Sequence, residues 1–185
     1  MKNSFILLLL ILSILSCKQK TNLQKEFICE TKSFSNTEIV SDFNNTFNIT
    51  VPKHWKTQLY FNNLQTQIFT ADTTKNLTNT YTLNFEYNSG DLIINDDFSN
   101  KIIKDLNQNN YILLKSKNDV FKNKPSIWFV SKGKKSDFDY FYFELYVKQT
   151  NTNYFKITSE IYGDKNLDER FCESIAVIET LKVLD

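Results

Sequence analysis

The chain has 185 residues, of which 41% are hydrophobic, and this length suits one globular domain with a sizeable core. Its 22 Lys and Arg and 21 Asp and Glu give a formal net charge of +1 at pH 7, without a long block of either sign. Nucleic-acid binding usually needs a basic face, so we expect no nucleic-acid partner.

The first 16 residues have the layout of a secretory signal peptide. Lys2 supplies the basic start, and an apolar block from Phe5 to Leu15 is interrupted only by Ser13. As a helix this block would reach about 18 Å at roughly 1.5 Å per residue, well short of the ~30 Å hydrocarbon core of a bilayer. The sequence therefore predicts export rather than a membrane-spanning helix.

Cys17 follows the apolar block, and the run Ile14-Leu15-Ser16-Cys17 resembles a bacterial lipobox. The resemblance implies cleavage before Cys17, which then carries a diacylglycerol and an N-acyl chain, typically palmitate. Two or more chains, at roughly 0.8 kcal/mol per buried CH₂, anchor a protein stably. The alternative is an ordinary signal peptide with a nearby cysteine. Lys18 is not the aspartate that retains lipoproteins at the inner membrane of well-studied Gram-negative bacteria, so we expect the outer membrane, facing the periplasm.

Two cysteines remain once Cys17 is assigned to the lipid, namely Cys29 and Cys172. An even pair in an exported chain indicates a disulfide, because that compartment is oxidising. Such a bond would close a very long loop and add about 5 kcal/mol of stability on the chain-entropy model. Two buried free thiols are the alternative.

Residues 17–43 are polar after the cysteine and predict a tether, followed by a single globular domain over residues 44–185. Alternating apolar residues predict strands over residues 46–51, 65–71 and 80–87. Residues 95–110 place Phe98, Ile102 and Leu106 at i, i+4 and i+8, which predicts an amphipathic helix. Asp96 and Asp97 at its start would interact favourably with the helix dipole.

A run of strands is predicted over residues 111–117, 125–133, 138–149 and 153–163, which are rich in aromatic and β-branched residues. The stretches 133–135 and 150–152 look like hairpin connections and favour antiparallel pairing. Residues 166–185 predict a closing helix whose apolar face carries Leu167, Phe171, Ile175, Ile178 and Leu181, with Asn166 and Glu169 as a capping box. This order of elements predicts an α+β domain with helices packed on an antiparallel β-sheet.

Three segments resemble the PsbP-like family, which includes the photosystem II extrinsic protein PsbP, a yeast factor acting on the Ran GTPase and bacterial lipoproteins of the DcrB type. They are "FNITVPKHW", in which Pro52 and Trp55 match, "FKNKPSIWFVSKG", and "NYFKITSEIYGDKNLDERFCESIAVIETLKV". His54 and Asn123 stand where the family often has glycine. The resemblance spans roughly residues 46–184 and implies an α/β/α sandwich around an antiparallel sheet. It implies no shared chemistry, because members of one fold bind diverse partners.

Residues suited to catalysis are sparse. His54 is the only histidine, and its place beside Pro52 and Trp55 fits a turn better than a catalytic or metal site. The sequence contains no CxxC, GxSxG, HExxH or P-loop motif. Helix starts or loops account for the acidic pairs Asp96-Asp97, Asp137-Asp139 and Asp168-Glu169. We therefore expect no enzyme activity, no catalytic residue, no metal site and no cofactor.

The alternation over residues 138–162 gathers polar and aromatic side chains on one face of the predicted sheet, opposite an apolar face. This candidate binding face consists of Tyr140, Tyr142, Glu144, Tyr146, Tyr154, Glu160 and Tyr162. Tyrosine joins a large apolar area to a polar tip and so suits a binding surface. The alternatives are that the closing helix covers this face, or that the pairs only stabilise a solvated sheet.

The sequence thus predicts a membrane-anchored envelope lipoprotein that acts as a non-enzymatic binding or accessory module. Its partners would be the membrane, through the lipid, and an unidentified envelope protein or ligand. One alternative is a periplasmic immunity or stress protein that neutralises a specific effector, and another is a hydrolase whose site would be an apolar pocket at Glu144 or Glu160.

Overall fold

The computed structural model describes residues 20–135 and 137–184. The predicted signal peptide, residues 1–16, and Cys17 lie outside these ranges. Within the described ranges, no helix is both long and apolar enough to cross a membrane.

A seven-stranded antiparallel sheet forms the centre of the molecule, with the order β3-β4-β5-β9-β8-β7-β6. Its strands are β3 (Lys56–Phe61), β4 (Gln65–Ala71), β5 (Tyr81–Ser89), β6 (Ile112–Phe121), β7 (Lys124–Lys135), β8 (Phe138–Lys148) and β9 (Asn153–Tyr162). A three-stranded antiparallel sheet contains β1 (Thr37–Ser41), β2 (Phe47–Pro52) and β10 (Lys182–Val183). The helices are α2 (Asn22–Glu26), α3 (Asp96–Gln108) and α4 (Leu167–Ile178), with a short 3-10 helix, η2 (Leu77–Asn79).

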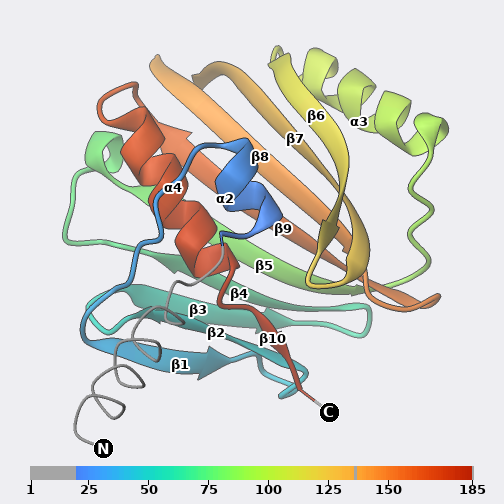
Figure 1. Ribbon diagram of the computed structural model, residues 1–185, viewed down its shortest axis with the longest axis horizontal. Coiled ribbons are helices and arrows are strands. Elements are labelled where there is room, and N and C mark those ends of the chain that lie inside the picture. Colours follow the sequence, from blue (N-terminus) through green and yellow to red (C-terminus); the bar gives the residue numbers. More distant parts are fainter. Residues whose placement is uncertain (1–19, 136, 185) are drawn as a thin grey trace, which may run out of the picture.

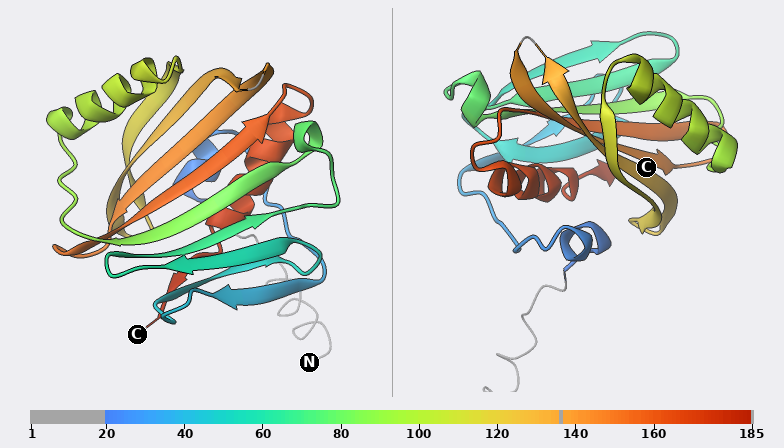
Figure 2. Two further views of the ribbon diagram at one scale, coloured as in Figure 1. Left: turned by 180° about the vertical axis from the view of Figure 1, so that it is seen from behind. Right: turned by 90° about the horizontal axis from the view of Figure 1, so that it is seen from above.

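The helices cover opposite faces of the large sheet (Figures 1 and 2). On one face α4, α2 and the small sheet enclose the main core, where Phe47 of β2 meets Phe155 of β9 with ring centroids 5.2 Å apart. On the other face α3 packs through Ile102 and Leu106 on a smaller apolar cluster that includes Phe129. This arrangement confirms the predicted α+β class, with helices on an antiparallel sheet.

The apolar periodicity identified the buried faces correctly. Phe47, Ile49 and Val51 are fully buried, as are Leu83 and Phe85 on β5. The alternating side chains reach the core because successive residues of a strand point to opposite faces. Period-two alternation therefore predicted correctly which side of each of these strands faces the core.

The predicted tether is wrong for residues 20–43, which belong to the fold. Thr21 caps α2 in a capping box with Gln24, and Leu23 of α2 is only 3% exposed. Further along, β1 pairs with β2 from Thr37 to Ser41. Five helical residues and an edge strand are too short to show a sustained period, so the pattern left them unassigned.

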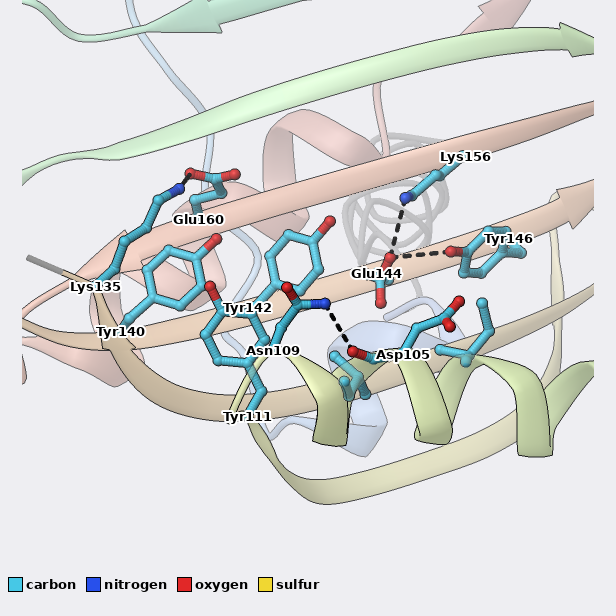
Figure 3. A pocket seen from close by; sticks show the side chains of 12 residues that line it. Asp105, Asn109, Tyr111, Lys135, Tyr140, Tyr142, Glu144, Tyr146, Lys156 and Glu160 are labelled. Carbon is cyan, nitrogen blue, oxygen red and sulfur yellow. Dashed lines mark hydrogen bonds and ion pairs between the residues drawn. The ribbon is translucent and has the colours of Figure 1, made fainter.

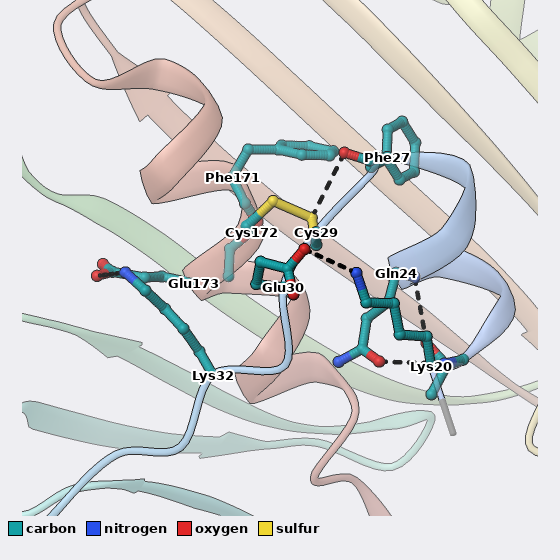
Figure 4. The surroundings of a disulfide bond; sticks show 11 residues. Lys20, Gln24, Phe27, Cys29, Glu30, Lys32, Phe171, Cys172 and Glu173 are labelled. Carbon is teal, nitrogen blue, oxygen red and sulfur yellow. Dashed lines mark hydrogen bonds and ion pairs between the residues drawn. A yellow bond between two sulfur atoms is a disulfide. The ribbon is translucent and has the colours of Figure 1, made fainter. Parts of the chain in front are cut away.

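The predicted disulfide between Cys29 and Cys172 is confirmed (Figure 4). Its Cα atoms lie 5.3 Å apart, and the bond joins the segment after α2 to the middle of α4. Lys32 on the same segment forms ion pairs with Glu169, 3.0 Å, and Glu173, 2.8 Å, of α4. The N-terminal segment is therefore fixed to α4 by one covalent bond and by surface charges.

Two local predictions are wrong. Gly133 to Lys135 is not a hairpin connection but the end of β7, where Gly133 pairs with Tyr140. β7 and β8 do form the predicted antiparallel hairpin, but their pairing continues to Lys135 and Phe138. A separate tight turn at Lys122 and Asn123 joins β6 to β7, and both of its φ angles are positive, as a type I′ two-residue hairpin requires. Asn166 adopts a left-handed conformation with no side-chain cap, so the predicted capping box with Glu169 does not form.

Candidate functional site

A half-open pocket of about 310 Å³ lies between α3 and the tyrosine-bearing face of β8 and β9 (Figure 3). The sheet supplies alternate residues of β8 and β9, because only these point toward α3. Its lining is Ile102, Asp105, Leu106, Asn109, Tyr111, Lys135, Tyr140, Tyr142, Glu144, Tyr146, Lys156 and Glu160. The pocket therefore joins one aromatic wall to two carboxylate and lysine pairs.

Three tyrosine rings form the aromatic wall. Tyr140 and Tyr142 are alternate residues on β8 with ring centroids 5.9 Å apart, and Tyr111 stacks on Tyr140 at 5.3 Å. Gly133 makes room for Tyr111, because a Cβ atom there would lie 2.2 Å from Cδ1 of the ring. One of the three glycines in the chain thus allows the Tyr111 ring to lie flat over β7.

Glu144 is the most buried carboxylate of the pocket, at 5% exposed. It accepts a hydrogen bond of 2.9 Å from the Tyr146 hydroxyl and an ion pair of 3.2 Å from Lys156. The Lys156 ammonium also lies over the Tyr146 ring, 5.7 Å from its centroid. A buried carboxylate is stable only with such compensation, so this trio positions a negative charge at the pocket floor.

Glu160 forms the second charged pair at the other end of the pocket. Its carboxylate accepts from Lys135 at 3.4 Å and from the Tyr162 hydroxyl at 3.0 Å. Lys135 also lies 5.1 Å from the Tyr140 ring centroid, within the range of a cation–π contact. Both ends of the pocket therefore hold an ammonium group between a carboxylate and a tyrosine ring.

Three phenol groups of the pocket, those of Tyr140, Tyr142 and Tyr146, remain protonated. Burial raises the pKa of Tyr140, Tyr142 and Tyr146 well above the usual tyrosine value, and the negative charges of Glu160 and Glu144 raise it further. A phenol with so high a pKa donates a hydrogen bond and is a poor general base. The pocket is thus equipped for recognition by stacking and hydrogen bonding.

The structure brings part of the predicted binding face together. Tyr140, Tyr142, Glu144, Tyr146 and Glu160 line the pocket, whereas Tyr154 and Tyr162 do not. Tyr154 packs beside the α3 cluster, and Tyr162 supports Tyr140 and Glu160 from outside the pocket. One alternative predicted that the closing helix covers this face. Helix α4 instead packs on the opposite face of the large sheet, and α3 covers part of the tyrosine-bearing face.

Sequence reasoning missed Asp105, Asn109, Tyr111 and Lys135 as pocket residues. Asp105 on α3 and Asn109, the C-cap of that helix, are four residues apart, so a helical projection places them on one side. Nothing in the sequence says which side of the sheet that helix covers. The sequence predicts Lys135 in a hairpin connection, whereas the structure pairs it with Phe138 at the end of β7.

His54 lies away from the pocket lining, in the turn between β2 and β3. Its side chain is 57% exposed, and Nε2 lies 3.4 Å from the Asp72 carboxylate. Asp72 in turn accepts hydrogen bonds from the backbone and hydroxyl of Thr74. Among residues 20–135 and 137–184, no group of three His, Cys, Asp or Glu side chains is placed to hold a metal ion.

No protein-family model matches the chain, and no curated protein matches it in sequence. Solved structures do match in fold. Cyanobacterial PsbP from Synechocystis sp. PCC 6803 superimposes with a TM-score of 0.59 at 10% identity, covering 84% of this chain and 97% of that one. The Ran-binding protein Mog1p of Saccharomyces cerevisiae gives 0.52 at 9% identity, covering 81% and 96%.

A third match, from Pseudomonas aeruginosa, is described as a protein of unknown function and has a TM-score of 0.50 at 7% identity. It covers 82% of this chain and 99% of that one. Identities this low establish the fold and carry no function with them. The sheet order, the helices on both faces and these superpositions together show that the chain folds as a PsbP-like domain.

Proposed function

We propose that this protein is a lipid-anchored lipoprotein of the bacterial cell envelope that binds a partner or ligand in the tyrosine pocket, without catalysing a reaction. Three features support the envelope location: the signal-peptide layout of residues 1–16, the lipobox at Cys17, and the Cys29–Cys172 disulfide. A disulfide of this kind suits an oxidising compartment. Lys18 after the cysteine favours the outer membrane, with the domain in the periplasm.

The observation that carries the binding proposal is the open pocket beside α3, with Tyr111, Tyr140 and Tyr142 on its wall. Tyrosine offers a rigid ring face and a hydroxyl, the combination enriched at binding sites. Glu144 and Glu160 accept hydrogen bonds at the two ends. The fitting ligand has a flat or apolar face for the rings and hydroxyl or amine donors for the carboxylates.

Both glutamates are already paired with lysines, and the phenols of Tyr140, Tyr142 and Tyr146 stay protonated. Neither feature supplies the free general base that a hydrolase would need. The non-enzymatic proposal therefore fits the pocket better than the hydrolase alternative.

Replacing Cys17 with serine tests the anchor. The Cys17→Ser chain should move from the membrane pellet to the soluble fraction, because lipid attachment requires the cysteine sulfur. Fractionation of intact envelopes with antibody detection measures the distribution. A Ser13→Ala chain, changed just before the lipobox residues Ile14 to Cys17, is the matched control and should stay with the membrane; a Cys17→Ser chain that stays there too would contradict the lipid anchor.

A photo-crosslinking residue, p-benzoylphenylalanine, tests the pocket. Placed at Asn109, which lines the pocket, it should form adducts in intact envelopes; placed at Asn107, exposed on the same helix, it should form few. Mass spectrometry identifies the adducts. An immunity protein would instead return one effector at stoichiometric yield, whereas a general accessory module would return a structural envelope component.

Gly133→Ala is the variant that alters the pocket, and it is combined with p-benzoylphenylalanine at position 109. The added methyl group must expel the Tyr111 ring, which is only half-buried and can turn outward. Losing one aromatic contact of roughly 1.4 kcal/mol should weaken adduct formation about tenfold. Unchanged adducts in this variant, with an unchanged melting temperature, would place binding elsewhere. Tyr146 is unsuited to this role because it is 5% exposed and packs on Phe98 and Phe129.

A further inference from the structure

The membrane anchor and the folded domain are separated by very little chain. This inference rests on the proposed lipidation of Cys17. Only residues 18 and 19 stand between Cys17 and Lys20, the first described residue. Even fully extended, that stretch spans about 11 Å from Cα to Cα. The part of the domain around Lys20 must therefore lie next to the lipid headgroups.

The chain around Lys20 is held firmly on the domain. Lys20 forms an ion pair of 2.9 Å with Glu30, and Asn22 donates a hydrogen bond of 3.0 Å to Asp119 of β6. Leu23 is buried in the main core, and the disulfide at Cys29 fixes the chain again after α2. A fixed attachment point with a short linker restricts how the domain can turn on the membrane.

The surface beside this attachment point exposes apolar side chains. Ile28 is 86% exposed and has a φ of 56°, a conformation that a β-branched residue rarely adopts. Leu114 of β6, on the same face as Phe27, is 47% exposed. Exposed isoleucine at a strained backbone position gains nothing from the fold itself, but it would gain from burial at a lipid interface.

A small apolar groove opens on the same side of the molecule. It encloses about 170 Å³ between Phe27, which follows α2, helix α4 and the face of the large sheet, with Leu114 and Phe171 also in its lining. Lys25 is exposed beside these residues, and Lys115 is exposed there as well, paired with Glu26 at the end of α2. Apolar side chains bordered by lysines are typical of surfaces that dip into the headgroup region of an anionic bilayer.

We propose that this α2 surface, formed by Lys25, Ile28 and Leu114, docks on the bilayer that holds the anchor. In Figures 1 and 2, α2 and α4 lie on one face of the large sheet and α3 on the other. The tyrosine pocket beneath α3 then points away from the membrane. Its ligand reaches the pocket from the aqueous side, so the lipids of the anchoring bilayer are not the ligand.

Tryptophan quenching by brominated lipid tests the orientation. The lipidated full-length chain is reconstituted into vesicles of phosphatidylethanolamine and phosphatidylglycerol that contain dibromo-phosphatidylcholine. Trp55 and Trp128 are buried, so the wild-type chain supplies a constant background. Ile28→Trp should lose most of its added emission. Ile93→Trp, at a 61% exposed site in the segment that leads to α3, is the matched control and should lose little.

Leu114→Trp provides a second probe on the α2 surface, at a residue without a positive φ, and it should also be quenched. Vesicle-bound protein in which Ile28→Trp and Leu114→Trp are quenched no more than Ile93→Trp would overturn the docking and leave the anchor intact. A wild-type chain that does not float with the vesicles would overturn the anchor and the docking together. The two failures are therefore distinguishable.

Discussion

Replacing Cys29 and Cys172 together with serine is expected to lower the free energy of unfolding by about 5 kcal/mol. The bond joins residues 143 positions apart, so it restricts almost the whole unfolded chain. Its loss frees that chain and so favours unfolding. A decrease of this size is comparable to the entire stability of many domains. Urea unfolding followed by circular dichroism measures it.

The Cys17→Ser chain is the matched control, because it removes a cysteine and leaves the bridge in place. It should unfold at the same urea concentration as the wild-type chain when both are measured without lipid. Reduction of that control chain with dithiothreitol should reproduce the effect of the double variant. A loss below about 1 kcal/mol would show that the packing of Leu23 and Phe27 alone holds the N-terminal segment on the domain.

Side-chain periodicity predicted the secondary structure best where an element is long and buried on one side. On β5, Tyr81, Leu83 and Phe85 alternate with half-buried polar residues. On α3, Ile102 and Leu106 recur at helical spacing and form the buried stripe. The disulfide also followed from the sequence, because assigning Cys17 to the lipid left one pair. These features are local or simple to count, so they can be read without knowing the tertiary structure.

Elements held by distant contacts could not be predicted in the same way. β3 is an edge strand in which Leu59, Tyr60 and Phe61 are all exposed, so it shows no buried alternation. β1 and α2 are short and depend on β2 and on the bridge to α4 for their positions. Their stability comes from partners far away in sequence, which a local pattern cannot reveal.

The candidate site shows the same division. Alternation along β8 and β9 placed Tyr140, Tyr142, Glu144 and Glu160 on one face before the fold was known. The pocket itself depends on α3 covering part of that face and on the Tyr111 ring lying against Gly133. Both are tertiary contacts between segments more than twenty residues apart. The sequence could therefore indicate the face, but not the pocket that α3 forms over it.

The last prediction concerns Arg170, the only arginine among the 22 basic residues. Its side chain is 4% exposed on α4 and donates hydrogen bonds to three backbone carbonyl oxygens. Nη1 donates to Thr80 at 3.0 Å and to Tyr162 at 2.7 Å, and Nη2 donates to Gly163 at 2.8 Å. The guanidinium thus joins α4 to the end of β9 and to the start of β5.

Replacing Arg170 with lysine should lower the free energy of unfolding by about 3 kcal/mol, because carbonyl groups would be left unpaired at roughly 1–3 kcal/mol each. A lysine places its donors on one nitrogen, whereas the planar guanidinium reaches carbonyls on separate segments. Burial also lowers the pKa of the Arg170 guanidinium, and the same burial would drive a lysine toward its neutral form. Thermal and urea unfolding measure the change.

Lys165→Met, at an exposed site five residues earlier, is the control and should change the stability by less than about 0.5 kcal/mol. Arg170→Met should cost more than Arg170→Lys, since it leaves all three carbonyls without a donor. Equal stability of Arg170→Lys and the wild-type chain would contradict the role of the planar fork. A stability that falls in the order wild type, Arg170→Lys, Arg170→Met would support the role of the guanidinium. This lysine-rich chain would then use its single arginine where three backbone carbonyls must be satisfied by one side chain.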